Sequence, residues 1–370
     1  MVAVSGERKF IFVTCQIGAE AAVKDELARG HPDLRFSYSR PGFLTFKRPE
    51  TSSVADDFWL DASFARSFGR VLGKADGSAT EALAADVWRV AANEQVDRLH
   101  VWPRDIASPG HRGFEPGVDD LAVAAREAIM RAAPGGSEAD LGGETLQGDR
   151  VLDCILVGPH EWWIGIHQVT RRTQCWPGGI WAGPPPDEMI SRAYLKMSEA
   201  LDWSNLPAKP GQRCVEIGCA PGGASQALLE RGLRVTGIDP ADVDPRIMQH
   251  REFRHIKQRG SDLRRREFQE FQWLVADMNI APACTLACVR DIVTHRLVHI
   301  RGLVMNLKFA HWGLADQVPE FVAEVRGWGY RRVRARQLSF QRQEICITGV
   351  KPQSRKRRRR SAASKQQTAS

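Results

Sequence analysis

One eight-residue stretch, Glu216-Ile-Gly-Cys-Ala-Pro-Gly-Gly223, restricts the possible folds of this chain more than any other part of its sequence. It follows a short apolar run at 213–217 and precedes a stretch with helical spacing at 224–231. Glycine lets the backbone turn sharply and approach another group closely. A strand, a tight glycine-rich loop and a helix are therefore predicted in direct succession.

The rest of the second half continues this alternation. Further strands are predicted at 233–238, 273–276, 302–307 and 344–348, and a further helix at 317–328. Strands that alternate with helices indicate a parallel, doubly wound sheet of the α/β class. Such sheets bind ligands beyond the carboxyl ends of their strands, so we expect the chemistry at that edge.

The glycine loop and the acids near it are typical of a nucleoside cofactor site. The glycines fall at i, i+4 and i+5, which is not the spacing of a dinucleotide fingerprint. A helix N-terminus at this point suits the carboxylate of S-adenosylmethionine. Asp239, at the end of the next strand, suits ribose hydroxyls, and Asp262 suits an adenine amino group. The alternative is a tight turn with solvated acids. The predicted cofactor-binding residues are Glu216, Gly218, Pro221, Gly222, Gly223, Asp239, Asp262 and Asp277.

Four charged residues are expected to meet at the same edge. Asp277 and Lys308 each follow a predicted strand, and Glu344 begins one that reaches this edge if it runs antiparallel. Lys196 lies in a predicted helix at 191–201, off its apolar stripe. A lysine at the buried end of an apolar strand is costly unless it is paired or functional. Ordinary lysine–carboxylate ion pairs are the alternative interpretation.

These motifs together resemble a known family. The runs S-R-A-Y-L-K ending at Lys196, V-A-D-M around Asp277, N-L-K ending at Lys308 and R-Q-E-I around Glu344, with the glycine loop, look like the FtsJ-type RNA ribose 2′-O-methyltransferases. The nearest match is the bacterial 23S ribosomal RNA cytidine 2′-O-methyltransferase family, which has an N-terminal THUMP region. The chain departs from the family at Ala224, where an aromatic residue is usual, and in the order of Cys219 and Ala220.

The resemblance implies a Rossmann-like class I methyltransferase domain with a mostly parallel seven-stranded sheet. It also implies S-adenosylmethionine as cofactor and a ribose 2′-hydroxyl of large-subunit ribosomal RNA as the methyl acceptor. Lys308 would be the general base, Asp277 would orient it, and Lys196 and Glu344 would position the ribose. The alternatives are a catalytically silent assembly factor that binds ribosomal RNA, and a methyltransferase acting on another RNA such as tRNA, a small molecule or a protein.

The first half has an α+β pattern that does not by itself indicate a function. Strands are predicted at 10–15, 42–46, 151–157 and 161–167, and helices at 80–100 and 118–133. By resemblance, 1–175 is a ferredoxin-like or THUMP-like RNA-binding region. A Pro/Gly-rich linker is predicted at 176–190, the methyltransferase domain at 191–351, and a disordered basic tail at 352–370, which could be a nuclear-localisation signal or, as the bacterial resemblance favours, an RNA tether.

The charge distribution agrees with two units that have different partners. Residues 1–190 carry 20 basic and 27 acidic side chains, 191–351 carry 25 and 17, and 352–370 carry 7 basic and none acidic. A basic second half favours RNA as the partner. The candidate contacts are arginines at 264–266, 331, 332, 334 and 336, and tryptophans at 162, 163, 176 and 181; solvated arginines and core tryptophans are the alternatives.

Cysteine usage and hydropathy limit the remaining possibilities. The eight cysteines form no C-x-x-C pair, and Cys284 and Cys288 lack further ligands at zinc spacing. We therefore expect no metal, free thiols and a reducing compartment. No stretch approaches the ~20 apolar residues of a membrane helix. A cytoplasmic protein that does not contact a membrane is expected; the sequence does not indicate its oligomeric state.

Overall fold

The computed structural model describes residues 10–49, 57–136 and 141–352, and these form two compact units. The first unit comprises the described residues up to Asp187 together with 310–316 and 336–345. The second comprises 188–309, 317–335 and the described residues from Cys346 onward. The division at 187/188 falls within the predicted linker. Apart from Pro352, the predicted basic tail lies outside the described residues.

The second unit is built on a seven-stranded sheet with the order β10-β9-β8-β11-β12-β14-β13. Its strands are β8 (Arg213–Ile217), β9 (Arg234–Ile238), β10 (Phe253–Ile256), β11 (Trp273–Ala276), β12 (Gly302–Lys308), β13 (Arg334–Arg336) and β14 (Glu344–Val350). By the division given above, the last residue of β13 and the first two residues of β14 are counted with the first unit. The pairings from β10 across to β12 are all parallel. The predicted parallel sheet is confirmed, whereas β10 and β13 were not predicted.

The direction of β14 follows from two contacts at one end of the sheet. A Cβ on Gly302, at the start of β12, would lie 3.3 Å from the carbonyl oxygen of Gly349, near the end of β14. The Lys351 N–H also donates to the Arg301 carbonyl (2.8 Å). The end of β14 therefore lies beside the start of β12, and the two strands run antiparallel. This direction puts Glu344, the first residue of β14, at the edge where β12 ends.

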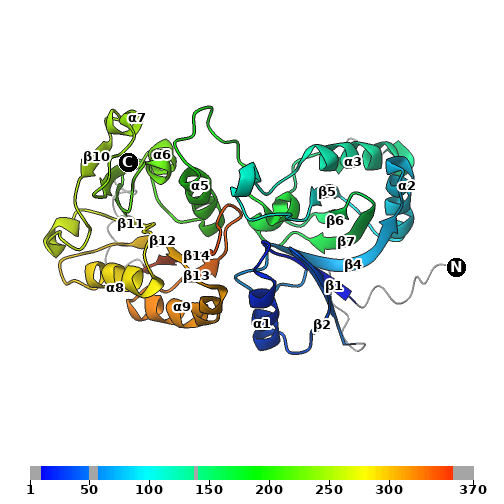
Figure 1. Ribbon diagram of the computed structural model, residues 1–370, viewed down its shortest axis with the longest axis horizontal. Coiled ribbons are helices and arrows are strands. Elements are labelled where there is room, and N and C mark those ends of the chain that lie inside the picture. Colours follow the sequence, from blue (N-terminus) through cyan, green and yellow to red (C-terminus); the bar gives the residue numbers. More distant parts are fainter. Residues whose placement is uncertain (1–9, 50–56, 137–140, 353–370) are drawn as a thin grey trace, which may run out of the picture. The chain divides into compact units, whose positions relative to one another are not determined.

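Helices cover both faces of this sheet. They are α5 (Ala193–Ser204), α6 (Gly223–Glu230), α7 (Pro245–Met248), α8 (Pro282–Val293) and α9 (Val318–Gly327). Figure 1 shows α5 and α6 on one side of the strands and α8 and α9 on the other. Asp244 caps α7 by accepting a hydrogen bond from the Arg246 N–H (2.9 Å), and proline begins both α7 and α8. The unit is thus doubly wound.

The first unit has a mixed seven-stranded sheet with the order β2-β3-β1-β4-β7-β6-β5. Its strands are β1 (Phe10–Thr14), β2 (Arg35–Arg40), β3 (Phe43–Lys47), β4 (Ser67–Asp76), β5 (Arg98–Pro103), β6 (Arg150–Gly158) and β7 (Glu161–Gln168). All pairings are antiparallel except that of β5 with β6. This agrees with the predicted α+β class; a THUMP-like identity stays a prediction.

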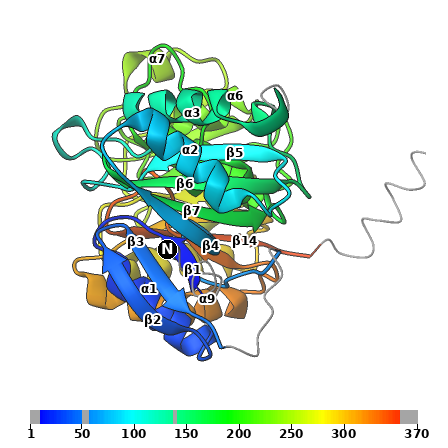
Figure 2. The same ribbon diagram turned by 90° about the vertical axis from the view of Figure 1, so that its right-hand side faces the viewer.

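Among its described residues, the first unit has three longer helices: α1 (Glu20–Gly30), α2 (Thr80–Ala91) and α3 (Asp120–Arg131). Figure 2 shows α2 and α3 together on one face of the sheet, where Leu83, Val87 and Ile129 enter its buried core. The predicted helix at 80–100 was wrong in its second half, because residues 98–103 form β5. Their apolar side chains alternate between the two faces and pair with β6, which helical spacing does not reveal.

The prolines of the predicted linker favour an irregular segment at 176–187, but part of this segment is regular. It contains a short 3-10 helix, Pro177–Gly179, which follows another at Arg172–Cys175. A Cβ on Gly179 would lie 2.3 Å from the Arg66 carbonyl oxygen, so only glycine fits there. The preceding turn is held by His167, whose Nδ1 lies 2.6 Å from Asp153 Oδ2 and whose Nε2 lies 3.2 Å from the Gln174 oxygen. Residues 172–181 therefore pack on the first unit.

Among the described residues, no helix combines the length and the apolar character needed to cross a membrane.

Candidate functional site

The carboxyl edge of the second sheet brings the predicted site residues together. Parallel register aligns Ile217, Ile238 and Ala276, which are the last residues of β8, β9 and β11. Gly218, Asp239 and Asp277 follow them directly. Met305 of β12 pairs with Ala276, so Lys308 extends from the same edge. The glycine loop, Asp239, Asp277 and Lys308 therefore all lie at this edge of the sheet.

An ion pair between Asp277 and Lys308 lies at the centre of this edge. Lys308 Nζ lies 3.0 Å from Asp277 Oδ1, and the two side chains are 28% and 10% exposed. Burial raises the pKa of the Asp277 carboxyl. The charges of Lys196 and Lys308 and hydrogen bonds from Lys308 and Asn306 outweigh burial, so the net pKa lies below its usual value. The predicted meeting of Lys196, Asp277 and Lys308 is present in the structure.

Asn306 is a contributor that the sequence prediction missed. It lies two residues before Lys308 on β12, is 2% exposed and hydrogen-bonds to Asp277. Residues i and i+2 of a strand face the same side, so Asn306 and Lys308 both reach the carboxylate. A polar residue inside an apolar strand was the available signal. Glu344 is buried and accepts a hydrogen bond from the Arg342 N–H (3.4 Å); strand order and direction place it at this edge.

The three loop glycines have different physical roles. Gly218 has a φ of +83°, and a Cβ there would lie 2.6 Å from the Asp277 carbonyl oxygen. Gly222 has a φ of +118° and precedes α6. Gly223 begins α6, and its Cβ would lie 2.2 Å from Ser191 Oγ and 3.1 Å from the Tyr194 nitrogen. Gly223 thus lets α6 approach the start of α5, the helix that carries Lys196.

Gly223→Ala tests this packing role. The added methyl group meets backbone as well as a side chain, so we expect a loss of ~1–3 kcal/mol in unfolding free energy from overpacking. We also expect slower methyl transfer, because any shift of α5 away from the added methyl group also displaces Lys196. Urea denaturation and turnover measure the two effects. Gly327→Ala is the matched control, since nothing lies within 4 Å of its Cβ position. Equal behaviour of the two variants would exclude the packing role.

Glu216, one of the predicted cofactor-binding residues, is buried in a contact with α6. Its carboxylate Oε2 accepts a hydrogen bond from the Ser225 hydroxyl of α6 (2.5 Å), and both side chains are buried. Burial raises the pKa of the Glu216 carboxyl to about 8; the Ser225 hydrogen bond lowers it, and the charges of Asp277 and Asp239 raise it. Glu216 therefore fastens α6 to β8 beneath the loop.

This raised pKa makes stability depend on pH. Between about pH 5 and pH 8 the unfolded chain releases a proton that folded Glu216 retains, so stability falls as the pH rises. Glu216→Gln keeps the acceptor for Ser225 and removes the titration. From pH 5.5 to 7.5 we expect the unfolding free energy of the variant to rise by about 2–3 kcal/mol relative to that of the wild type. Urea titrations at both pH values measure the unfolding free energies. A difference between variant and wild type that is the same at both pH values would contradict a neutral Glu216.

The remaining predicted cofactor residues lie around the loop. Asp239 is half-buried and accepts hydrogen bonds from the N–H groups of Ala220 (3.1 Å) and Ala241 (2.8 Å), so its carboxylate is fixed beside the loop. Pro221 is exposed, and Asp262 is exposed in a turn after β10. An acid fixed at the end of β9 beside a loop of glycines fits a nucleoside with an amino-acid tail. Glu216 and Gly223 have the structural contacts described above.

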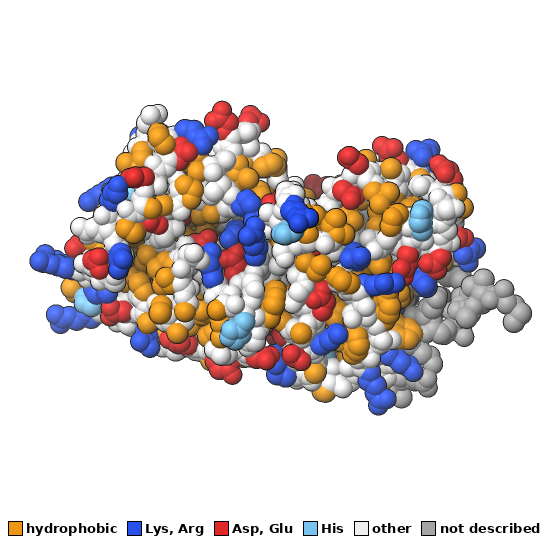
Figure 3. All heavy atoms as spheres, in the orientation of Figure 1, with side chains coloured by type: hydrophobic (Ala, Val, Ile, Leu, Met, Phe, Trp, Pro, Cys, Tyr) orange, Lys and Arg blue, Asp and Glu red, His pale blue; other side chains and the backbone are white. Residues whose placement is uncertain are grey.

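Two predicted RNA-contacting arginines are structural. Arg334 donates to the carbonyls of Ser204 (2.5 Å) and Trp203 (3.3 Å). Arg336 is 6% exposed and donates to three carbonyls, of which the Gly179 oxygen is nearest (3.1 Å). Both side chains therefore bind backbone oxygens of the protein itself. Arg265 pairs with Asp291 (2.7 Å). Figure 3 shows basic side chains interspersed with acidic ones over the visible face.

The tryptophans also separate into two groups. Trp162 and Trp181 are 1% and 7% exposed and belong to the core, as the alternative interpretation had it. Trp163 and Trp176 are half-buried. Alternate residues of β7 face opposite sides of the sheet, so Trp162 packs beneath α2 and α3 while Trp163 lies on the other face.

Comparison with known proteins agrees with the geometry of the second unit. Residues 189–317 match the family model described as FtsJ-like methyltransferase. The resemblance to this family is therefore confirmed for that stretch, which contains the glycine loop, Lys196, Asp277 and Lys308.

Curated relatives carry one name. The chain is 32% identical over 185 residues to "Ribosomal RNA large subunit methyltransferase M" of Halorhodospira halophila, covering 49% of this chain and 53% of that protein. It is 32% identical over 186 residues to the protein of the same name from Alkalilimnicola ehrlichii, covering 48% and 50%. The chain thus spans about half the length of these relatives. A solved Burkholderia thailandensis 1,6-didemethyltoxoflavin-N1-methyltransferase with bound S-adenosylhomocysteine is 16% identical, with a TM-score of 0.34 over 44% of this chain and 79% of that one.

Proposed function

We propose that this protein is an S-adenosylmethionine-dependent methyltransferase that modifies a ribose 2′-hydroxyl of RNA, with large-subunit (23S) ribosomal RNA as the substrate. The observation that carries the proposal is the Lys308–Asp277 pair at 3.0 Å, with Lys196 close enough to lower the pKa of Asp277. The match of 189–317 to the FtsJ-like family and the name of the curated relatives support it.

The residues of the pair have complementary tasks in this proposal. A ribose 2′-hydroxyl is a poor nucleophile until a base removes its proton, and Lys308 Nζ is that base. Asp277 holds Nζ in place and balances the positive charge that Lys308 gains with the proton. Lys196 and Glu344 position the ribose, which supplies much of the rate enhancement. S-adenosylmethionine, when bound, supplies an electrophilic methyl group on a sulfonium.

The cofactor would be held by part of the predicted set. Gly218 and Gly222 allow the loop its shape, Asp239 would accept hydrogen bonds from ribose hydroxyls, and Asp262 would accept one from the adenine amino group. Pro221 lies between the two glycines. In the first unit, we infer a THUMP-like RNA-binding role for the α+β region, which would act on ribosomal RNA in the cytoplasm.

A methyl-transfer assay tests the proposed function. The full chain is incubated with tritiated S-adenosylmethionine and ribosomal RNA that lacks the modification, and label in the RNA is measured before and after ribonuclease treatment. Label that survives alkaline cleavage as a 2′-O-methylated dinucleotide identifies the acceptor oxygen. Label in protein or in small molecules alone would overturn the proposal.

The same assay separates the alternative functions. A silent assembly factor would bind ribosomal RNA without transferring label, although the Lys308–Asp277 pair argues against loss of chemistry. A tRNA methyltransferase would label purified tRNA faster than ribosomal RNA. Mapping the labelled nucleotide in each RNA then identifies the substrate.

A further inference from the structure

A pocket on the first unit does not belong to the site described above. It has a volume of about 570 Å³ and lies over β1, β2, β3, β4 and β7. Val71 and Trp163, which line it, pack in the apolar cluster on the face opposite α2 and α3. The residues that line it are Phe10, Ser37, Tyr38, Arg40, Thr45, Val71, Gly73, Lys74, Asp76, Glu161 and Trp163.

A register shift in β4 helps to form this pocket. Val71 pairs with Gly165 and Lys74 pairs with Trp163, so three steps along β4 match two along β7. The extra residue lets Val71 and Lys74 face the same side, although an uninterrupted strand would point them to opposite sides. The bulge therefore places Lys74 on the same face of the sheet as Val71 and the rest of the pocket lining.

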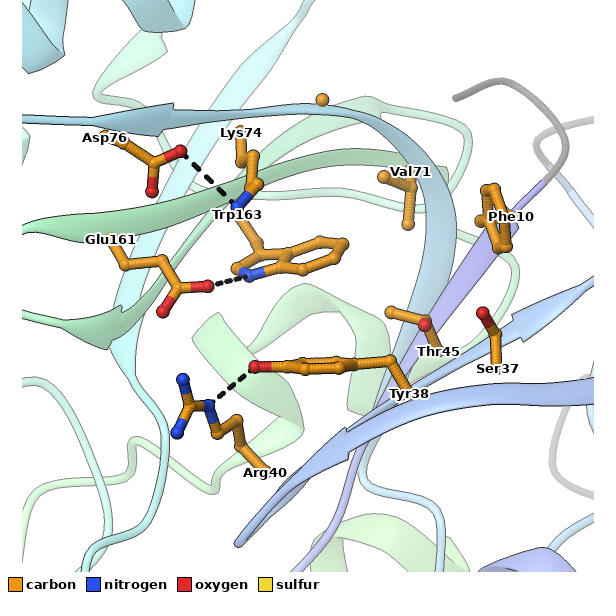
Figure 4. A pocket seen from close by; sticks show the side chains of 11 residues that line it. Phe10, Ser37, Tyr38, Arg40, Thr45, Val71, Lys74, Asp76, Glu161 and Trp163 are labelled. Atoms are coloured by element: carbon orange, nitrogen blue, oxygen red, sulfur yellow. Dashed lines mark hydrogen bonds and ion pairs between the residues drawn. The ribbon is translucent and has the colours of Figure 1, made fainter. Parts of the chain in front are cut away.

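The pocket has an aromatic surface between a charged end and an apolar end. The rings of Tyr38 and Trp163 are stacked, with centroids 5.8 Å apart and planes 21° apart. Figure 4 shows Arg40, Lys74, Asp76 and Glu161 at one end, and Phe10, Val71, Ser37 and Thr45 at the other. A ligand that fits must offer a flat apolar part and a polar edge.

The charged groups point to the chemistry of that edge. Arg40 Nε donates to the Tyr38 hydroxyl (2.6 Å), and this contact does not use the two terminal nitrogens of the guanidinium. Lys74 Nζ lies 3.4 Å from Asp76 and 5.9 Å from the centroid of the Trp163 ring. Glu161 accepts from Trp163 Nε1 (3.1 Å). Two cations suit a phosphodiester backbone, while carboxylates accept from the amino groups of bases.

We propose that this pocket binds an unpaired nucleobase of RNA by stacking on Tyr38 and Trp163. Nucleobases combine a planar aromatic face with a hydrogen-bonding edge, and proteins recognise single-stranded RNA by stacking such bases on aromatic side chains. Glu161 and Asp76 favour bases with an exocyclic amino group, such as cytosine and adenine, over uracil. The proposal rests on RNA as the substrate of the protein, as inferred above.

Binding of short fluorescent RNA oligomers to the full chain tests the pocket. The probes are unstructured 12-mers of adenosine, cytidine or uridine and an abasic 12-mer with the same backbone. We expect Tyr38→Ala and Trp163→Ala to weaken binding of oligoadenosine by about 5- to 150-fold, the range measured for loss of one stacked base. Binding of the abasic probe should change little. Tyr38→Phe keeps the ring and should bind nearly as well as wild type.

Two further variants make the test specific. Phe36→Ala removes an exposed aromatic residue (48%) from the same strand outside the pocket, so it should leave binding unchanged. Glu161→Gln should narrow the preference for adenosine and cytidine over uridine. Trp163 also contacts buried Phe43 (5.0 Å), so thermal melting must show that Trp163→Ala is folded; Tyr38 on β2 gives the independent result.

Wild-type affinity in Tyr38→Ala would overturn the proposal, and so would an equal loss of affinity for the abasic probe. Lack of measurable binding of every oligomer by the folded wild-type chain would overturn it as well. If the pocket variants bind RNA normally and the chain methylates ribosomal RNA, the pocket proposal fails and the proposed function stands. Binding in the pocket without any methyl transfer to RNA would overturn the proposed function alone.

Discussion

Replacing Lys308 with alanine is expected to lower the rate of methyl transfer by about 10²- to 10⁴-fold, the usual contribution of a general base. Lys308 ends β12 at the site and pairs with Asp277, and its side chain is 28% exposed, so the substrate hydroxyl can reach it. S-adenosylmethionine should still bind, because the glycine loop and Asp239 lie on other strands. Single-turnover transfer and equilibrium dialysis of the cofactor measure the two properties.

Lys308→Arg separates proton transfer from charge. Arginine keeps the positive charge and the pairing with Asp277 but does not lose its proton at any assay pH. We therefore expect it to be as inactive as Lys308→Ala. Lys209→Ala is the matched control: Lys209 is exposed in the loop before β8, at the opposite edge of the sheet. Near-normal turnover of Lys308→Arg would rule out Lys308 as the base.

The second unit was predictable because its signals are local. An apolar run followed by glycines predicts a strand and a turn wherever it occurs, and the carboxyl ends of parallel strands always share one edge. Asp277 and Lys308 could therefore be brought together from sequence alone. Gly223 could not be interpreted in the same way, because its role depends on Ser191, and only the packing of α6 on α5 brings the two together.

The first unit shows what local patterns leave out. β4 was not predicted, since its glycines and its bulge interrupt the alternation of a strand. Residues 98–100, which begin β5, were predicted as the end of the helix at 80–100, because apolar residues on both faces of a buried strand mimic helical spacing. Arg336 was predicted to contact RNA, but the backbone oxygens that it satisfies come from distant segments. Charge alone did not distinguish a surface arginine from a buried one.

Asp277→Asn is the second change with a large expected effect. It keeps the shape of the side chain and removes the negative charge that Lys308 and Lys196 share. Loss of orientation at the reacting group costs ~100-fold in turnover when it moves the group by about 1 Å. We therefore expect kcat to fall. Because Asp277 is also a predicted cofactor contact, KM for S-adenosylmethionine must be measured separately.

The pH profile identifies how Asp277 acts. The pKa of Asp277 lies below its usual value, so the carboxylate stays charged throughout an assay from pH 6 to pH 10. The activity of the wild type should rise with pH, because a general base acts only in its unprotonated form. Without the carboxylate, less negative charge stabilises the protonated base, so the rising limb should move to lower pH.

A control separates this electrostatic effect from a general loss of charge. Asp291→Asn removes the same charge from an exposed pair with Arg265 on the same unit and should change neither kcat nor the profile. If Asp277 had only a structural role, Asp277→Asn would lower kcat but leave the rising limb of the pH profile at its wild-type position. A limb that moves to lower pH in Asp277→Asn alone requires that Asp277 hold the proton on the base, since no other carboxylate has been changed.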